Sequence, residues 1–229
     1  LGDVYKRQPV YNEEKNLAYC IREIWAIEKS LGLQIEIIVV DNNSNDSSYQ
    51  IAKQLGVKLI KVLEKGYGKA LKEGINAASN EWVAFADADS TYELFDLKKM
   101  IEVINRRPDV DLVVADRING KIEKFAMPLL HRYVGTPLLT HLIEALYGIK
   151  VGDCNSGFRL FRKSEFEKWN LISQGMEFAS EMIVKAAKSD SKIASVSSGL
   201  RQSKFQRSSH LRPVIDGLRH LKVIFQHFI

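Results

Sequence analysis

Short apolar, β-branched runs alternate with longer amphipathic stretches along most of this chain. Four runs have the near-continuous apolar character of strands that are buried on both faces: 35–40, 57–63, 82–86 and 112–115. Between them, apolar side chains recur at helical spacing over residues 17–31 and 94–104. This alternation predicts an α/β fold, with a mostly parallel central sheet flanked by helices. No linker or internal repeat divides the 229 residues, so we expect a single domain.

The composition excludes several classes of protein. Lys and Arg number 33 against 28 Asp and Glu, which gives a net charge of +5. This mild excess suits anionic substrates or an anionic membrane surface and is too small to indicate nucleic acid. Cys20 and Cys154 lie far apart, so neither a disulfide framework nor a zinc site is indicated, and a reducing, cytosolic setting fits. No run reaches the about 20 apolar residues of a transmembrane helix.

Both ends of the chain depart from this alternation. Residues 1–8 lack the apolar run expected of a first buried strand, and we predict a non-native or artefactual end there, ahead of a catalytic domain over 9–209. Residues 210–229 form a basic amphipathic pattern, which favours either a core-packing helix or a juxtamembrane helix on a membrane surface. The apolar face consists of Leu211, Val214, Ile215, Leu218, Leu221, Phe225 and Phe228. The opposite, basic face consists of Arg212, Arg219, His220 and Lys222.

The first chemical motif is Pro-Val-Tyr-Asn-Glu-Glu at 9–14, where a strand should pass into a helix. Asn12 could cap that helix, and Glu13 suits its positive first turn. Capping does not explain Pro9 and Tyr11, which would place a fixed turn and a flat ring beside a ligand.

A second motif, the Asx-rich run 41–46, follows the strongest predicted strand. Ligands of open α/β sheets bind beyond the carboxyl ends of strands, so Asp41 could accept hydrogen bonds from a nucleobase or ribose. A turn capped by Ser44 or Asp46 explains the run equally well.

Two further motifs suit phosphate and metal. Asp87 and Asp89 end the predicted strand 82–86 and point to one side, so both carboxylates can meet one Mg²⁺ or Mn²⁺ that also takes diphosphate oxygens. The alternative is a solvated turn. In 65–70, two glycines open a helix where Lys69 could add charge beside phosphate, although the P-loop spacing is absent.

In this order, the four segments resemble the nucleotide-sugar half of the family 2 glycosyltransferases, which have a GT-A fold. Later segments resemble the polyprenyl-phosphate (dolichol-phosphate type) sugar transferases more specifically. These segments are Ala115-Asp116-Arg117, Met127-Pro128 with His131-Arg132, the run 153–159, the run 175–178 with Glu181, and the run 207–211.

The resemblance implies a role for each matching residue. Asp87 and Asp89 would hold the metal and, with Arg117 and Arg132, carry catalysis. The nucleotide sugar would be bound by Pro9, Tyr11, Glu13, Asp41, Lys69, Asp87, Ala88 and Asp89. The acceptor would be bound by Arg117, Arg132, Asn155, Ser156, Arg159, Glu181 and Arg207. Surface salt bridges are the alternative role for the arginines.

Departures from the family pattern leave the donor sugar open. Thr91 stands where relatives that make dolichol-phosphate mannose often carry Gln as a further metal ligand, and Glu177 stands where many have a basic residue. The histidines His131, His210 and His220 share no metal-ligand spacing and are interpreted as polar or packing residues.

The leading hypothesis is a metal-dependent inverting hexosyltransferase that moves a sugar from a nucleoside diphosphate sugar to a polyprenyl phosphate at the cytoplasmic face of the membrane. Such an acceptor is already anionic and needs only cationic groups beside it. Transmembrane helices beyond residue 229 are expected by the same resemblance. A glycan hydroxyl acceptor would instead require a base such as Asp153 or Glu181. A non-catalytic nucleotide-sugar or membrane-surface binding module is the third hypothesis, favoured by the missing first strand.

Overall fold

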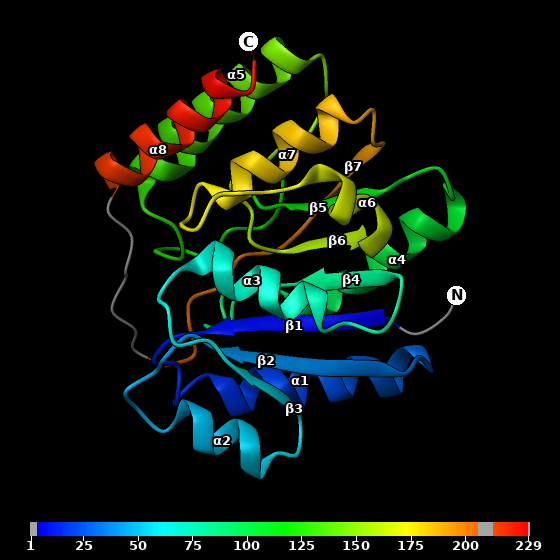
Figure 1. Ribbon diagram of the computed structural model, residues 1–229, viewed down its shortest axis with the longest axis vertical. Coiled ribbons are helices and arrows are strands. Elements are labelled where there is room, and N and C mark those ends of the chain that lie inside the picture. The colour runs from blue at the N-terminus through cyan, green and yellow to red at the C-terminus, as the bar shows by residue number, and fades with distance from the viewer. Residues whose placement is uncertain (1–3, 206–212, 229) are drawn as a thin grey trace.

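The computed structural model describes residues 4–205 and 213–228, which form one seven-stranded sheet covered by helices (Figure 1). The strand order is β3-β2-β1-β4-β6-β5-β7. The strands are β1 (Val4–Val10), β2 (Ile35–Asp41), β3 (Lys58–Lys61), β4 (Trp82–Phe85), β5 (Leu112–Asp116), β6 (Arg159–Arg162) and β7 (Ile193–Ser197). All neighbours pair in parallel except β6, which runs antiparallel to β4 and β5. The predicted α/β fold with a mostly parallel sheet is confirmed.

Helices cover both faces of the sheet. One face packs against α1 (Leu17–Leu31), α2 (Ser48–Gln54), the short η1 (Leu94–Asp96) and α4 (Leu97–Arg106). The other packs against α3 (Tyr67–Asn76), α5 (Thr136–Tyr147), α6 (Lys163–Trp169), α7 (Phe178–Lys188) and α8 (Pro213–Gln226). Neighbouring β2 residues separate accordingly, since Val39 faces the first set and Ile38 and Val40 the second. Burial on both faces explains the continuous apolar runs.

The start of the chain corrects one expectation. We predicted no strand ahead of Pro9, yet β1 is an interior strand of the sheet and pairs with both β2 and β4. Tyr5, for example, is in register with Glu36 on one side and Val83 on the other. Backbone hydrogen bonds to two neighbouring strands do not require apolar side chains, which is why the apolar pattern missed this strand. The proposed origin of residues 1–8 stays a prediction.

The predicted terminal helix is present as α8, but its packing face differs from the predicted one. His220, Val223 and Ile224 are buried against α5 and α7. Leu218 and Phe225, placed on the predicted apolar face, are exposed instead. The side chains of Leu211, Arg212 and Val214 lie outside the described set. The helix packs through the flank that carries His220 because Tyr147 Oη donates to the Ile224 carbonyl at 2.6 Å and Ser180 Oγ bonds the imidazole.

Two further elements complete the fold. A π-helical turn, η2 (His131–Gly135), leads into α5, and Gly148 with a left-handed φ of 66° caps the carboxyl end of α5. In the described part of the chain, no helix combines the length and apolarity needed to cross a membrane.

Candidate active site

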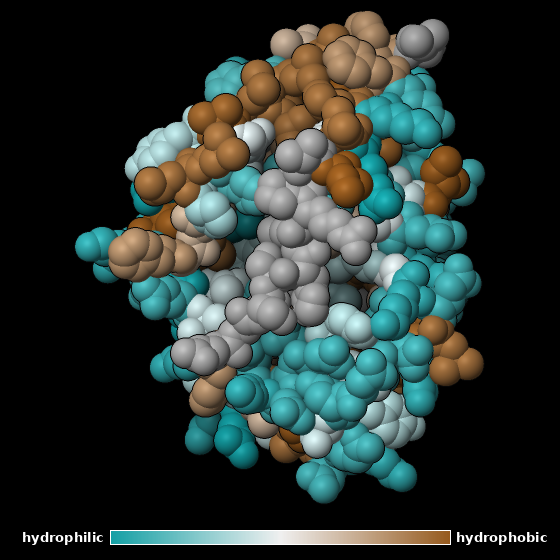
Figure 2. Space-filling model, turned by 90° about the vertical axis from the view of Figure 1, so that its left-hand side faces the viewer, coloured by the Kyte–Doolittle hydropathy of each residue, from teal (hydrophilic) through white to brown (hydrophobic). Residues whose placement is uncertain are grey.

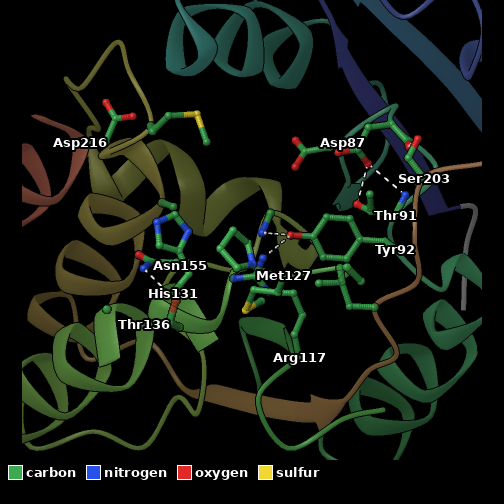
Figure 3. A pocket seen from close by; sticks show the side chains of 18 of the residues that line it. Asp87, Thr91, Tyr92, Arg117, Met127, His131, Thr136, Asn155, Ser203 and Asp216 are labelled. Carbon is green, nitrogen blue, oxygen red and sulfur yellow. Dashed lines mark hydrogen bonds between the residues drawn. The ribbon is translucent and has the colours of Figure 1, made fainter. Parts of the chain in front are cut away.

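A cavity of about 1120 Å³ lies where the carboxyl ends of β4 and β5 meet the amino end of β6 (Figure 3). Asp87 and Asp89 follow β4, Arg117 follows β5, and Gly157 precedes β6, and all four line this cavity. Because β6 is antiparallel to its neighbours, its amino end lies at the same sheet edge as the carboxyl ends of the others. This topology brings motifs about 70 residues apart in sequence to one wall.

The two carboxylates after β4 lie in a tight turn. Asp89 is buried, and its Oδ1 accepts hydrogen bonds from the Thr91 backbone N at 3.0 Å and from Thr91 Oγ1 at 2.7 Å. Ser90 between them has a left-handed φ of 61°, and its hydroxyl bonds Asn16 Oδ1 at 2.8 Å. Tyr67 Oη donates to Asp87 Oδ1 at 3.1 Å. These bonds hold two carboxylates at the cavity wall.

The pair fits a hard divalent cation. Carboxylate oxygens are the ligands that Mg²⁺ and Mn²⁺ prefer, usually as one or two groups, with water and phosphate oxygens completing the set. Among the described residues no cluster of three or more His, Cys, Asp or Glu side chains could form an all-protein metal site. Thr91 also lines the cavity, and its hydroxyl donates to Asp89 Oδ1 at 2.7 Å. The two aspartates would therefore share the cation with a bound diphosphate.

Gly157 is fixed by the groups that converge on it. A Cβ at this position would lie 2.9 Å from Asp87 Oδ2, 3.2 Å from Tyr92 Oη and 3.3 Å from Tyr67 Oη. Any side chain would therefore displace the carboxylate of Asp87 or one of the two phenols.

Arg117 faces the aspartates across the cavity. Its Nε and Nη2 donate to both oxygens of Asp153, at 2.6 and 3.0 Å, and Nη1 donates to Tyr92 Oη at 3.4 Å. Burial opposes the charge of this guanidinium, but the carboxylate of Asp153 outweighs it, so the pKa of Arg117 lies above its usual value. Arg117 stays cationic, as predicted for an acceptor-binding residue, and Asp153, fully buried, is its counterion rather than a base.

Three residues predicted to bind the acceptor have structural positions instead. Arg159 is fully buried, and its guanidinium donates to the carbonyls of Ser156, Ala179 and Cys154 at 2.9, 2.7 and 2.8 Å. Burial lowers its pKa. Ser156 is also buried, and its Oγ accepts a hydrogen bond from the Phe158 backbone N at 3.3 Å. Neither lines the cavity.

Glu181 is the third. Its carboxylate has no exposed surface and accepts hydrogen bonds from the backbone N atoms of Ile172 and Ser173, at 2.9 and 2.8 Å. A buried carboxylate needs such hydrogen bonds to offset its desolvation, and these bonds fix the loop ahead of α7. Glu181 does not line the cavity. The predictions for Ser156, Arg159 and Glu181 as acceptor ligands are wrong.

The other acceptor candidates differ in position. Asn155 lines the cavity, and its role as an acceptor ligand stays a prediction. Arg132 does not line it, although its neighbour His131 does, and its guanidinium lies 5.2 Å from the ring of Tyr133. Arg207 and His210 lie outside the described residues.

The donor motifs 9–14 and 41–46 come together, although of the predicted donor residues only Asp87 and Asp89 line the cavity. Asn12, with φ of 57°, accepts a hydrogen bond from the Asn45 backbone N at 2.8 Å, which ties the segment 9–14 to the segment 41–46. Asp41 is 1% exposed, and its buried Oδ2 has no hydrogen-bond partner among the described residues. An unsatisfied buried carboxylate oxygen is costly, so Asp41 is suited to accept a ligand N–H or O–H.

The other donor candidates take varied positions. Tyr11 Oη accepts a hydrogen bond from Lys65 Nζ at 2.8 Å. Glu13 is buried and accepts one from Asn16 Nδ2 at 3.0 Å. Pro9 lies in β1 opposite Val40, and Ala88 is buried between the aspartates. Lys69 forms an ion pair with Glu64 and does not line the cavity.

Sequence reasoning missed several cavity residues. Tyr67 and Tyr92 lie next to recognised motifs, so proximity to the glycines of 65–70 and to the two aspartates was the available signal. Asp216 and His220 enter the cavity wall from α8, which only the tertiary packing decides. His220 was interpreted as a packing residue, and it is one that also borders the cavity: burial lowers its pKa, and its Nδ1 lies 2.7 Å from Ser180 Oγ.

Comparison with known proteins agrees with this geometry. Residues 9–169 match the model of glycosyl transferase family 2. The chain belongs to this family. Solved structures of glucosyl-3-phosphoglycerate synthase from Mycobacterium tuberculosis share the fold: the complex with Mn²⁺, UDP and phosphoglyceric acid superposes with a TM-score of 0.74 at 19% identity, over 99% of this chain and 78% of that one. The predicted GT-A fold is thereby confirmed.

Three of the curated relatives come from Haloferax volcanii and Pyrococcus furiosus. The low-salt glycan biosynthesis hexosyltransferase Agl6 of Haloferax volcanii is 34% identical over 93% of this chain and 51% of its own length. A dolichyl-phosphate hexose transferase of the same organism is 29% identical over 81% of this chain and 77% of its own. The dolichol-phosphate mannosyltransferase of Pyrococcus furiosus is 28% identical over 93% and 61%. The chain thus spans about half the length of Agl6.

Proposed function

We propose that this chain is the catalytic part of a metal-dependent inverting hexosyltransferase. It would move a sugar from a nucleoside diphosphate hexose to a polyprenyl phosphate at the cytoplasmic face of a membrane. One observation carries the proposal: a single cavity has Asp87 and Asp89 on one wall and Arg117 on another, and its outer walls carry exposed apolar side chains.

On the donor side, Asp87 and Asp89 would hold Mg²⁺ or Mn²⁺, which when bound would neutralise charge on the departing diphosphate. The buried Oδ2 of Asp41 would accept a hydrogen bond from the nucleoside. The structural neighbours, which were solved in complex with UDP and Mn²⁺ or Mg²⁺, support this choice of cofactor and donor class.

On the acceptor side, the charge balance favours phosphate over a hydroxyl group. A hydroxyl acceptor would need a general base, and both carboxylates predicted for that role are committed elsewhere, Asp153 to Arg117 and Glu181 to backbone N–H groups. A phosphate needs only a cation that orients it. Arg117 is locked by Asp153 with Nη1 directed towards the cavity side of Tyr92, which suits that task. The relatives described as dolichyl-phosphate and dolichol-phosphate transferases support the same acceptor.

An apolar surface borders the cavity. Large apolar side chains are exposed on the segment 125–138 and on α8, and brown side chains gather at this end of the molecule in Figure 2. We define this surface by Phe125, Leu129, Leu130, Tyr133, Val134, Leu138, Ile215, Leu218, Phe225 and Phe228. One basic side chain contacts this surface, since Lys124 Nζ lies 5.2 Å from the centroid of the Phe125 ring. Such a surface suits contact with anionic lipid, and the lipid tail of the acceptor would leave the cavity along it.

The experiment compares acceptors. Purified chain, donor sugars, Mn²⁺ or Mg²⁺ and either undecaprenyl phosphate or an oligosaccharide are combined, and radiolabelled product is separated by solvent extraction. We expect transfer to the lipid phosphate, loss of transfer in Asp89→Ala, and wild-type transfer in the exposed control Asp109→Ala. Transfer to the oligosaccharide alone would contradict the acceptor, and donor binding without turnover would favour a binding module.

Membrane contact is measured separately. Leu130→Glu and Leu218→Glu should each reduce co-sedimentation with vesicles that contain anionic lipid by about 10-fold, because each exposed leucine would insert into the lipid and an acid would not. The control Leu63→Glu lies outside this surface at a leucine that is 71% exposed. Equal vesicle binding by all three variants would contradict a membrane role for the apolar surface.

A further inference from the structure

Tyr92 lines the cavity together with Asp87 and Asp89 and contacts Arg117 on the other side of the proposed site. Its ring packs edge-on against Phe158 with centroids 5.8 Å apart, and its backbone forms a bridge with Leu200. The guanidinium of Arg117 lies 5.8 Å from the ring centroid. With only 3% of its surface exposed, Tyr92 is a rigid group whose hydroxyl is aimed at the cavity between Asp87 and Arg117 (Figure 3).

The Tyr92 hydroxyl oxygen is the acceptor in both of its hydrogen bonds to the described residues. The backbone N of Gly157 donates to Tyr92 Oη at 2.6 Å, and Arg117 Nη1 donates to it at 3.4 Å. A phenol oxygen accepts at its lone pairs and carries one proton to donate. Among the described residues, no hydrogen bond uses that proton. Two N–H donors occupy the acceptor side of the oxygen, so the proton is turned away from both of them.

The acceptor for this proton must therefore come from what occupies the cavity. The cavity walls indicate the chemical identity of this acceptor. It would lie next to the positive charge of Arg117 and next to a cation held by Asp87 and Asp89, and a phosphoryl oxygen suits both neighbours. The contacts from Arg117 and Gly157 withdraw electron density from the phenol oxygen, and this polarisation strengthens Tyr92 as a donor.

We propose that Tyr92 is a catalytic residue that donates a hydrogen bond to a phosphoryl oxygen bound between Asp87 and Arg117. The proposal rests on the proposed function for the identity of the phosphate, which is that of the acceptor. The proton is not transferred. Tyr92 orients the phosphate monoester, with Arg117, so that one of its remaining oxygens faces the sugar.

The test uses binding as well as turnover. Isothermal titration calorimetry measures the affinity of the chain, loaded with Mn²⁺ and a nucleoside diphosphate, for citronellyl phosphate, a short isoprenyl phosphate monoester. Tyr92→Phe should weaken this affinity by about 10-fold, the loss expected for one hydrogen bond to a charged group. Nucleoside diphosphate affinity should change little. Tyr49→Phe, which removes a phenol on the outer helix α2, is the matched control and should bind as the wild type does.

A second variant separates donation from a structural role. Replacing Tyr92 with 3-fluorotyrosine keeps the ring and hydroxyl but makes the phenol a better donor and a poorer acceptor. If Tyr92 donates to the phosphate, the fluorinated protein binds citronellyl phosphate more tightly than the wild type. If the hydroxyl serves only to accept from Gly157 and Arg117, fluorination weakens or does not change the affinity, and the proposal is wrong.

The two proposals fail in different ways. If the wild type binds citronellyl phosphate and responds to both Tyr92 variants but transfers sugar only to oligosaccharides, the proposed acceptor is wrong and the role of Tyr92 stands. If lipid phosphate is glycosylated by the wild type and by Tyr92→Phe with equal kcat and KM, the proposed function stands and the role of Tyr92 is wrong. Absence of phosphate binding in the wild type would overturn both.

Discussion

Arg159 offers a sharp distinction between a structural and a functional arginine. The guanidinium has no exposed surface and, among the described residues, no carboxylate bound to it, and it links three carbonyls from two segments, at Cys154 and Ser156 and at Ala179. It thus joins the loop ahead of β6 to the first turn of α7. We expect Arg159→Met to destabilise the protein strongly while leaving acceptor recognition intact.

The magnitude follows from the three hydrogen bonds. Each buried carbonyl left without a partner costs about 1–3 kcal/mol, which sums to about 3–9 kcal/mol. Relief of the desolvation of an unpaired buried cation offsets part of this sum, and Met fills most of the volume, so we expect a net loss near the lower end, about 3 kcal/mol. For a domain of this size that loss lowers Tm by about 6–12 °C.

Urea unfolding followed by circular dichroism measures the loss, with the midpoint lowered and the m-value unchanged. Arg162→Met is the matched control on the same strand, since Arg162 is partly exposed and donates to the Pro108 carbonyl at 2.7 Å, and its loss should be below about 1 kcal/mol. At a temperature where both variants are folded, both should keep the wild-type KM for the acceptor. The reasoning is refuted if Arg159→Met is as stable as Arg162→Met and raises that KM.

Two further predictions concern Gly157 and His220. Gly157→Ala would place a methyl group 2.9 Å from Asp87 Oδ2, so we expect Mn²⁺ affinity by calorimetry to weaken and turnover to fall by about 10–100-fold; unchanged Mn²⁺ binding would contradict this crowding. Burial lowers the pKa of His220 below its unfolded value of about 6.5, so stability is complete above pH 6.5 and is lost as pH falls towards the folded pKa, because the unfolded chain binds the extra proton. In urea unfolding, the His220→Gln variant should lose less stability than the wild type between pH 7.5 and 5.5. An equally steep loss in the variant would mean that other groups cause the pH dependence, such as His227, because burial lowers the pKa of His227 as well.

The predicted elements were most accurate where local pattern and burial agree. The expected strands at 35–40, 82–86 and 112–115 correspond to β2, β4 and β5, each buried on both faces. The amphipathic pattern over 17–31 corresponds to α1. By contrast, β6 is only four residues long and contains two arginines, and β1 has a polar centre, so neither shows the apolar run that marks a strand.

Some residues of the candidate site were predictable from local sequence, and others were not. The sequence identified Asp87, Asp89 and Arg117, because each directly follows a recognisable strand and strand ends determine where such groups lie. It could not separate Arg117 from Arg159, since both stand in polar motifs of similar composition. Only packing places one at the cavity and the other beneath it.

The sequence by itself therefore determined the fold class and the chemical groups at the strand ends, because hydrophobic periodicity and strand termini are local properties of the chain. The tertiary structure alone decided which groups face one another. The antiparallel direction of β6 carries Gly157 to the edge where Asp87 lies, and the docking of α8 adds Asp216 and His220 to the cavity wall. These contacts join residues far apart in sequence, and they depend on burial and pairing summed over the whole core rather than on any local signal.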